Sequence, residues 1–224
     1  MSTYAILPVK HFERAKQRLG GTLSDGSRWA LAEAMVTDVL VALRRAKAVD
    51  HVLTVTSEAR AESLAIGWGA DVIADPQERS HSNAATLGIR AAVDRGATRV
   101  LLVPGDCPSL DPREVDDLLI DGHGVVIVPD RHGTGTNALV LSPPDAIEPS
   151  FGPDSRARHE ALADAAGVPH RVAEVAVLGL DVDTPGDLAE LAAELEARRG
   201  EAPFTRGALR QLDRAGAAPV REPA

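Results

Sequence analysis

Short apolar segments alternate with helical segments over most of the chain, and this alternation constrains its fold more than any other feature. Strands are predicted at 4–9, 51–56, 71–74, 100–103, 124–130, 138–141, 172–177 and 178–185. Between them, the spacing of apolar residues predicts helices beginning near residues 25, 59, 83, 111, 158 and 187. Strands and helices that alternate with short connections form right-handed crossovers. The sequence therefore predicts an α/β fold in which helices flank both faces of a mostly parallel, mixed sheet.

The length of the chain fits one domain. With 224 residues, the chain is long enough to bury a substantial core. The last predicted helix ends at residue 199, so residues 1–199 form the predicted domain. Residues 200–224 are rich in Pro, Ala and Arg, and they predict a tail that is loose or lies on a partner subunit of a homodimer.

Charge and hydropathy exclude several classes of partner. The formal net charge is −9 and basic residues are scattered among acidic ones, so no basic face for nucleic acid is expected. No apolar run approaches the length of a membrane span, and the first residues lack the features of a secretion signal. The single cysteine, Cys107, suits a reducing compartment. These features predict a cytoplasmic protein that binds neither membranes nor nucleic acid.

The segment at 100–108, Val-Leu-Leu-Val-Pro-Gly-Asp-Cys-Pro, places one carboxylate directly after an apolar strand. Ligands of open α/β sheets bind outside the carboxyl ends of the strands. Asp106 is therefore a candidate for metal or phosphate chemistry, with capping of the next helix as the alternative. Cys107 is expected to be a packing residue.

Two further acids, Asp181 and Asp183, lie two positions apart near the end of the chain. If this segment is a strand, residues i and i+2 face the same way, and both carboxylates can converge on one cation. Mg²⁺ is the expected cation because it combines one or two carboxylates with phosphate oxygens. The alternative for Asp183 is that it caps the helix that begins near Pro185.

Basic residues and anion-binding turns complete the candidate site. Lys10, Lys16 and Arg18 follow the first strand, where they can meet phosphates or form a solvated basic face. The loop Gly-Thr-Gly-Thr that ends at Thr136 can present several donors to one anion or serve a hairpin. Ser155 is placed to cap a helix or to bind an anion there.

Several common enzyme classes lack their motifs here. The chain contains no Walker-type Gly-Lys-Ser/Thr loop and no Gly-x-Gly-x-x-Gly turn after the first strand. It also has no obvious Ser/His/Asp or Cys/His set. Attack of a bound phosphate on the α-phosphate of a nucleotide needs no protein nucleophile. Nucleotidyl transfer therefore fits the residues better than ATP hydrolysis or dinucleotide redox chemistry.

An ordered set of motifs within residues 4–195 resembles a known family. The motifs are Leu-Pro-Val-Lys and Ala-Lys-Gln-Arg-Leu, Asn-Ala-Ala, Pro-Gly-Asp-Cys-Pro, Pro-Asp-Arg-His-Gly-Thr-Gly-Thr-Asn-Ala-Leu, Phe-Gly-Pro-Asp-Ser with Arg-His, and Leu-Asp-Val-Asp-Thr-Pro. Together they resemble the phosphoenolpyruvate and 2-phospho-L-lactate guanylyltransferases of deazaflavin coenzyme F-420 biosynthesis. The resemblance implies a Rossmann-like nucleotidyltransferase fold, as in nucleotide-diphospho-sugar transferases. It also implies Mg²⁺, and GTP and a phosphorylated three-carbon acid as substrates.

The resemblance also implies that Thr136, Gly152 and Ser155 bind the acceptor. From the residues themselves we expect catalysis from Lys10, Lys16 and Asp106. The expected nucleotide ligands are Arg18, Asn83, Pro104 and Gly105, with Asn83 reading guanine, and the expected metal ligands are Asp106, Asp181 and Asp183. The chain departs from the family at 77–82, where Gln-Glu-Arg-Ser-His-Ser replaces a glycine-rich run.

Other activities stay open at this point. The acceptor is phosphoenolpyruvate, with 2-phospho-L-lactate and 3-phospho-D-glycerate as alternatives that differ from it by few atoms. The same fold also serves cytidylyl- and molybdopterin-directed transferases. A non-catalytic nucleotide-binding module, in which the acids are only helix caps, is the remaining alternative.

Overall fold

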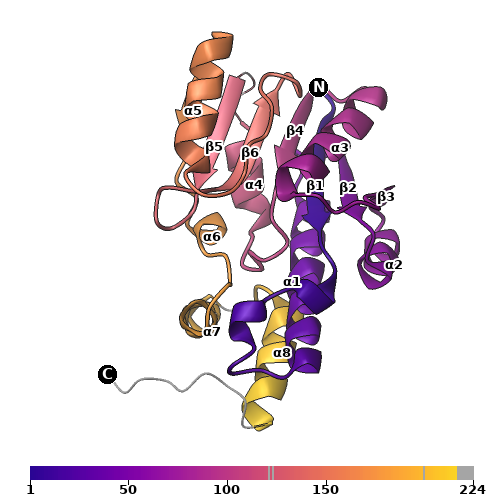
Figure 1. The fold of residues 1–224 in the computed structure, drawn as a ribbon, viewed down its shortest axis with the longest axis vertical. Helices are drawn as coiled ribbons and strands as arrows, with labels where there is room; N and C mark the ends of the chain where they lie inside the picture. The colour runs from indigo at the N-terminus through magenta and orange to yellow at the C-terminus, as the bar shows by residue number, and fades with distance from the viewer. Residues whose placement is uncertain (121, 123, 199, 216–224) are drawn as a thin grey trace.

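A seven-stranded sheet forms the centre of the computed structural model, which describes residues 1–120, 122, 124–198 and 200–215 (Figure 1). The strands are β1 (Thr3–Val9), β2 (His51–Thr56), β3 (Asp71–Ala74), β4 (Arg99–Leu102), β5 (Gly124–Pro129), β6 (Thr136–Ser142) and β7 (His170–Val172). Their order is β3-β2-β1-β4-β6-β5-β7, and only β6 runs antiparallel to its neighbours. The predicted mostly parallel, mixed sheet is therefore confirmed.

The antiparallel direction of β6 determines where its first residue lies. Leu139 pairs with Leu102, the last residue of β4. Thr136, three residues earlier on β6, therefore lies beyond the carboxyl end of β4. The start of β6 and the segment after β4 share one edge of the sheet.

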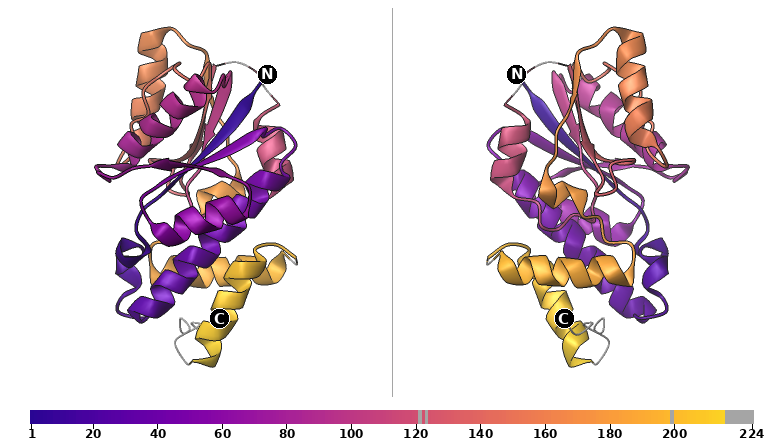
Figure 2. Two further views of the ribbon diagram at one scale, coloured as in Figure 1. Left: turned by 90° about the vertical axis from the view of Figure 1, so that its right-hand side faces the viewer. Right: turned by 90° about the vertical axis from the view of Figure 1, so that its left-hand side faces the viewer.

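Helices cover both faces of the sheet (Figure 2). They are α1 (Asp25–Arg45), α2 (Ala59–Gly67), α3 (His81–Asp94), α4 (Pro112–Leu118), α5 (Ser155–Ala166), α6 (Ala176–Gly179), α7 (Pro185–Ala197) and α8 (Pro203–Arg214). Successive residues of β1 point to opposite faces, so Leu7 belongs to the apolar cluster that contains residues of α1, α2, α4 and α6, whereas Ile6 belongs to the cluster that contains residues of α3 and α5. None of the described helices has the combination of length and hydropathy needed to cross a bilayer.

Helix α8 corrects the prediction of a loose tail from residue 200. A third apolar cluster joins α1, α7 and α8, and Leu212 of α8 is buried in it. Asp38 of α1 accepts hydrogen bonds from the backbone N–H groups of Phe204 and Thr205, at 3.2 and 2.7 Å. This distant carboxylate satisfies the start of α8, so no local cap signals the helix in the sequence. The final part of the predicted tail, 216–224, lies outside the described residues.

The predicted strands at 172–177 and 178–185 are wrong. Strand β7 ends at Val172, and the N–H groups of Leu178 and Gly179 then bond to the carbonyl of Val175, which starts the short helix α6. Val177 and Leu178 are buried against the sheet in this conformation. Burial in a helical turn overrides the strand propensity of the valines.

Gly88 allows α3 to lie close to β1 and β2. A Cβ atom at this position would be 2.4 Å from Ile6 Cγ2 and 3.0 Å from Val55 Cγ2. We expect Gly88→Ala to lower the free energy of unfolding by about 1–3 kcal/mol, because overpacking outweighs the gain in helix propensity. Gly26→Ala in α1, where the new Cβ meets none of the described residues within 4 Å, is the matched control and should be neutral or stabilising. Urea denaturation measures both, and equal effects would contradict the close approach.

Candidate active site

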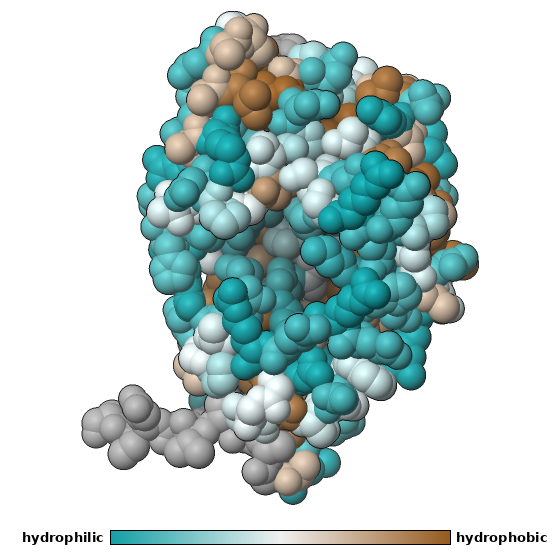
Figure 3. Space-filling view, in the orientation of Figure 1, coloured by the Kyte–Doolittle hydropathy of each residue, from teal (hydrophilic) through white to brown (hydrophobic). Residues whose placement is uncertain are grey.

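A cavity of about 280 Å³ lies at the carboxyl ends of β1 and β4. The end of β1, the loop after it, α1 and the segment after β4 supply its walls. In Figure 3 this face of the molecule is hollowed near its middle, and hydrophilic side chains surround the hollow. Open α/β sheets bind ligands at this edge, so the cavity is the candidate active site.

The buried ammonium of Lys16 joins two of the predicted acids. Its Nζ lies 2.5 Å from Asp106 Oδ2 and 3.2 Å from Asp183 Oδ1, and its side chain is only 7% exposed. Burial lowers the pKa of Lys16, but the charges of Asp106 and Asp183 outweigh this effect and raise the pKa above its ordinary value. Lys16 therefore stays positively charged, and for this residue the alternative of a solvated basic face is wrong.

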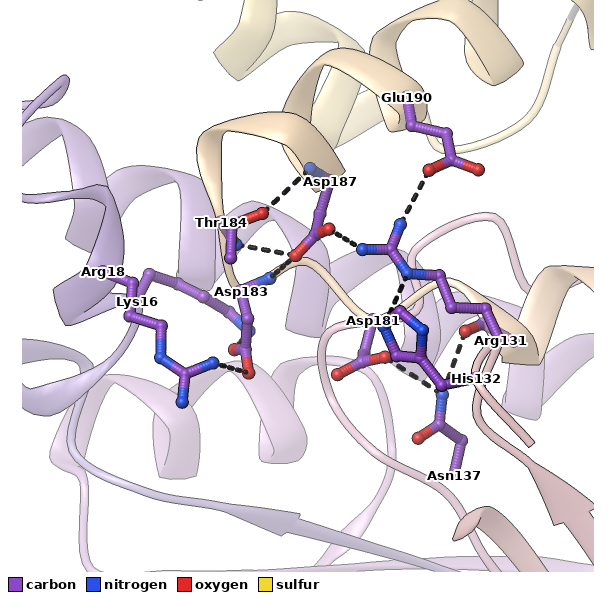
Figure 4. Close-up of polar contacts among 11 residues, drawn as sticks. Lys16, Arg18, Arg131, His132, Asn137, Asp181, Asp183, Thr184, Asp187 and Glu190 are labelled. Atoms are coloured by element: carbon purple, nitrogen blue, oxygen red, sulfur yellow. Dashed lines mark hydrogen bonds and ion pairs between the residues drawn. The ribbon is translucent and has the colours of Figure 1, made fainter. Parts of the chain in front are cut away.

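The other two predicted basic residues lie at or near the same cavity. Lys10 follows β1 directly and lines the cavity with an exposed side chain. Arg18 is largely exposed, and its Nη1 atom lies 3.8 Å from Asp183 Oδ2. It approaches Asp183 from the same side as Lys16 (Figure 4). Two short 3₁₀ turns, Phe12–Arg14 and Gln17–Leu19, shape this loop, and Lys16 between them has a left-handed backbone with φ +54°. The structure therefore brings Lys10, Lys16 and Arg18 to one site.

Asp106 and Asp183 are not helix caps. Asp111 caps α4 by accepting from the N–H of Arg113 at 2.7 Å, so Asp106 is free to face the cavity. Thr184 caps α7 in a capping box with Asp187. Both capping alternatives for the predicted metal ligands are therefore wrong.

A network that the sequence analysis missed holds the backbone of Asp183. The carboxylate of Asp187 accepts from the N–H groups of Asp183 and Thr184 at 2.9 and 2.7 Å. Arg131, from the loop after β5, pairs with Asp187 and lies 2.7 Å from Glu190 (Figure 4). These bonds connect the loop after β5 to the start of α7, and their sequence signal is the Thr-x-x-Asp spacing of a capping box.

Asp181 differs from Asp106 and Asp183 in that no ion pair with Lys16 is found for it among the described residues. The segment from Leu180 to Thr184 is not a strand, so the expected alignment of Asp181 with Asp183 on one strand face is wrong. Asp181 Oδ1 instead lies 3.4 Å from Asn137 Nδ2 (Figure 4). Burial raises the pKa of Asp181, and the nearby charge of Asp106 raises it further.

The donor set suits Mg²⁺ in the presence of a phosphorylated substrate. Among residues 1–120, 122, 124–198 and 200–215, no group of three or more His, Cys, Asp or Glu side chains is arranged to hold a metal ion. Asp106 and Asp183 nevertheless converge on one positive charge, the Lys16 ammonium. Mg²⁺ takes one or two carboxylates together with phosphate oxygens, so this pair fits it.

The segment between β4 and Asp106 packs closely on the core. Pro104 and Gly105 line the cavity, and a Cβ atom at Gly105 would lie 3.0 Å from Val36 Cγ2 on α1. Cys107 is fully buried, and burial raises the pKa of its thiol well above the ordinary value. The thiol therefore stays protonated, which agrees with the expected packing role.

A second group of predicted residues gathers where β6 begins and α5 begins. Gly152 has φ +115°, a conformation that favours glycine. The expectation that Ser155 caps α5 is wrong, because Asp154 holds the cap position and Ser155 is the first helical residue. The Ser155 side chain is buried, and its hydroxyl has no hydrogen-bond partner within the described part of the chain. An unpaired hydroxyl at a helix N-terminus is suited to bind an anion.

The loop before β6 connects this second group to the acidic one. The N–H of Arg156 bonds to the carbonyl of Thr134 at 3.1 Å, which ties the Gly-Thr loop to α5. Asn137, next to Thr136, contacts Asp181. The predicted acceptor residues and the predicted metal residues therefore share one edge of the sheet.

His81, rather than Asn83, lines the cavity from α3. Ser80 caps this helix by accepting from the N–H of Asn83 at 3.1 Å, and the Asn83 side chain is half-buried. The His81 ring packs edge-on against Phe151, with ring centres 4.6 Å apart. Burial lowers the pKa of His81 to about 4. The assignment of guanine to Asn83 stays a prediction.

His159 on α5 makes stability depend on pH. Burial, followed by the charge of Arg158, lowers its pKa to about 4 from an ordinary value of 6.5. Between these values the unfolded chain binds a proton that the folded protein does not. The contribution of neutral His159 to the free energy of unfolding is therefore complete above pH 6.5, and it falls as the pH decreases towards 4. We expect the stability advantage of wild type over His159→Asn to shrink by up to about 3 kcal/mol across this window.

Equilibrium denaturation of both proteins at about pH 7, 5.5 and 4 checks this expectation. Subtracting the free energy of unfolding of the variant from that of wild type at each pH removes the effect of the other titrating groups, which both proteins share. A difference that does not change with pH would contradict a neutral, buried His159.

Comparisons with known proteins show the family of the chain. The family model described as guanylyl transferase CofC like matches residues 3–213. Phosphoenolpyruvate guanylyltransferase of Conexibacter woesei is 52% identical over 216 residues, covering 95% of this chain and 97% of that protein. 3-Phospho-D-glycerate guanylyltransferase of Phenylobacterium zucineum is 38% identical over 193 residues, covering 84% and 88%.

A solved structure shows the same fold. A Desulfovibrio desulfuricans G20 protein, described as a nucleotide-diphospho-sugar transferase, superposes with a TM-score of 0.73 at 21% identity and covers 96% of each chain. The fold is thus the nucleotidyltransferase fold that the sequence predicts. With the matched family model and relatives, the chain belongs to the CofC-like guanylyl transferase family.

Proposed function

We propose that the protein transfers GMP from GTP to phosphoenolpyruvate, which yields enolpyruvyl-diphospho-guanosine and pyrophosphate for coenzyme F-420 biosynthesis. The observation that carries this proposal is the buried Lys16 ammonium between Asp106 and Asp183, at the sheet edge where Thr136 and Ser155 also lie. The family and the name of the 52% identical relative support the reaction and the acceptor.

The reaction needs positioned charges rather than a protein nucleophile. A phosphate oxygen of the acceptor attacks the α-phosphorus of GTP and forms a new P–O bond. The bond between the α-phosphorus and the bridging oxygen to the β-phosphate breaks, and pyrophosphate leaves with the electron pair. Lys10, Lys16 and Arg18 would bind the triphosphate and stabilise the charge that develops on it.

Asp106 and Asp183 would hold Mg²⁺, and Asp181 would support the site from its position beside Asn137. A bound Mg²⁺ supplies charge neutralisation at the phosphate oxygens. The capping-box network on Asp187 fixes the backbone of Asp183 and so limits where its carboxylate can reach.

Thr136, Gly152 and Ser155 would bind the acceptor. The Ser155 hydroxyl, which has no partner among the described residues, and the positive end of the α5 helix dipole match a carboxylate or phosphate. One relative is named for 3-phospho-D-glycerate, so this acid is the second candidate acceptor.

Purified protein tests the proposal when it is incubated with GTP, Mg²⁺ and an equimolar mixture of phosphoenolpyruvate, 2-phospho-L-lactate and 3-phospho-D-glycerate. We expect pyrophosphate release and a product mass that corresponds to guanylylated phosphoenolpyruvate. CTP and ATP serve as nucleotide controls. A product formed from one of the other two acids would identify that acid as the acceptor. If no pyrophosphate is released with any of the three acids, the proposed transfer is refuted.

A further inference from the structure

His159 is fully buried on α5, one helical turn after Ser155, and both of its ring nitrogens are hydrogen-bonded. The N–H of Ser150 lies 2.8 Å from Nε2, and Thr136 Oγ1 lies 3.0 Å from Nδ1. A backbone N–H can only donate, so Nε2 accepts and carries no proton. The neutral ring therefore carries its proton on Nδ1 and donates it to the Thr136 hydroxyl oxygen.

This tautomer restricts what the Thr136 hydroxyl can do. Its oxygen accepts from His159, so its own hydrogen cannot point to the ring and is left to donate elsewhere. Within the described residues no other hydrogen bond of this hydroxyl is found, and Thr136 is 8% exposed. The hydrogen of this hydroxyl therefore has no protein acceptor among the described residues.

The surroundings hold the His159 ring in place. Arg158 donates from Nε to Ser150 Oγ at 3.0 Å and from Nη2 to the Ser150 carbonyl at 2.9 Å, which fixes the backbone that bonds to Nε2. The ring of Phe151 packs edge-on against His159, with centres 5.4 Å apart. The Phe151 N–H donates to Ser82 Oγ at 2.8 Å, which joins the turn to α3.

We infer that His159 is a positioning residue that commits the Thr136 hydroxyl to donate a hydrogen bond to an anionic oxygen of the acceptor. This inference rests on the proposed function, because it takes Thr136 and Ser155 as the acceptor site. Two hydroxyl donors, Thr136 at the start of β6 and Ser155 at the start of α5, favour a carboxylate or phosphate and disfavour a neutral donor group as their partner. His159 therefore contributes to the preference for an acidic acceptor without contacting it.

Two matched substitutions separate the two hydrogen bonds of the ring. His159→Asn places an amide N–H near the position of Nδ1 and retains the donor to Thr136. His159→Gln reaches the position of Nε2 and retains only the acceptor for Ser150. We expect the KM for phosphoenolpyruvate to rise about tenfold or more in His159→Gln and less than about threefold in His159→Asn. The KM for GTP should not change in either variant.

A double-mutant cycle shows whether His159 acts through Thr136. Thr136→Val should raise the KM for phosphoenolpyruvate, and adding His159→Gln to it should raise this KM no further. If His159→Gln has the same effect with and without the Thr136 hydroxyl, the inference is overturned. It is also overturned if His159→Asn is impaired as much as His159→Gln.

The tautomer can be read in the wild-type protein, which keeps the inference testable if a variant fails to fold. Long-range ¹H–¹⁵N spectra of the histidine rings should show a neutral His159 with its proton on Nδ1. A ring protonated on Nε2, or on both nitrogens, would overturn the inference. This measurement does not depend on turnover, whereas absence of turnover by wild-type protein with all three acids would refute the proposed function instead.

Discussion

Asp106→Asn is expected to reduce the rate of GMP transfer by about 10³-fold or more while the protein stays folded. Asparagine has the shape of aspartate but lacks the charge that pairs with Lys16 and that would bind Mg²⁺. The Lys16 ammonium keeps its second partner, Asp183, at 3.2 Å, so no buried charge is left alone in the variant. The loss is expected in kcat, because the charge acts on the phosphates during transfer.

Asp145→Asn is the matched control for Asp106→Asn. It makes the same chemical change at an exposed position on the segment between β6 and α5. Its turnover should equal that of wild type, and the thermal unfolding of both variants should stay within a few degrees of wild type. Pyrophosphate release under saturating GTP and phosphoenolpyruvate measures the effect, and undiminished turnover by Asp106→Asn would refute the metal assignment.

The sheet could be predicted from the sequence because its central strands are buried on both faces. Residues of β1, β2, β4 and β5 are almost all buried, which requires continuous apolar runs that are visible without an alignment. The prediction failed after Val172, where short valine-rich segments fit a strand and a buried helical turn equally well. Helix α8 was missed because Asp38, which satisfies its first N–H groups, lies far away in the chain.

The charged residues of the candidate site could be predicted from the sequence, but the contacts between them could not. Spacing after strand ends identified Asp106 and Lys16, because parallel strands bring their carboxyl ends to one edge. It gave no sign that Lys16 lies between two acids, since this depends on the left-handed backbone at Lys16 and on the non-strand path before α7. His159 was visible only as part of a motif, and its role depends on the tautomer set by Ser150.

Lys16→Met is expected to change cation binding and turnover in opposite directions. In the free protein, the Lys16 ammonium lies between the two carboxylates that would hold Mg²⁺. Its raised pKa means that it does not give up its charge to make room for the metal, so Lys16 and the cation compete electrostatically. Without the ammonium, Asp106 and Asp183 repel each other and gain more from a divalent cation.

We therefore expect Lys16→Met to bind Mn²⁺, a spectroscopic substitute for Mg²⁺, about tenfold more tightly in the absence of nucleotide. Turnover should fall about 10²-fold or more because a charge that stabilises the triphosphate is lost. Lys10→Met is the matched control, since Lys10 lines the same cavity without pairing with either acid in the described structure. It should weaken GTP binding and leave Mn²⁺ affinity near that of wild type. Electron paramagnetic resonance titration measures the free Mn²⁺, and equal affinities in wild type and Lys16→Met would show that the ammonium does not oppose the metal.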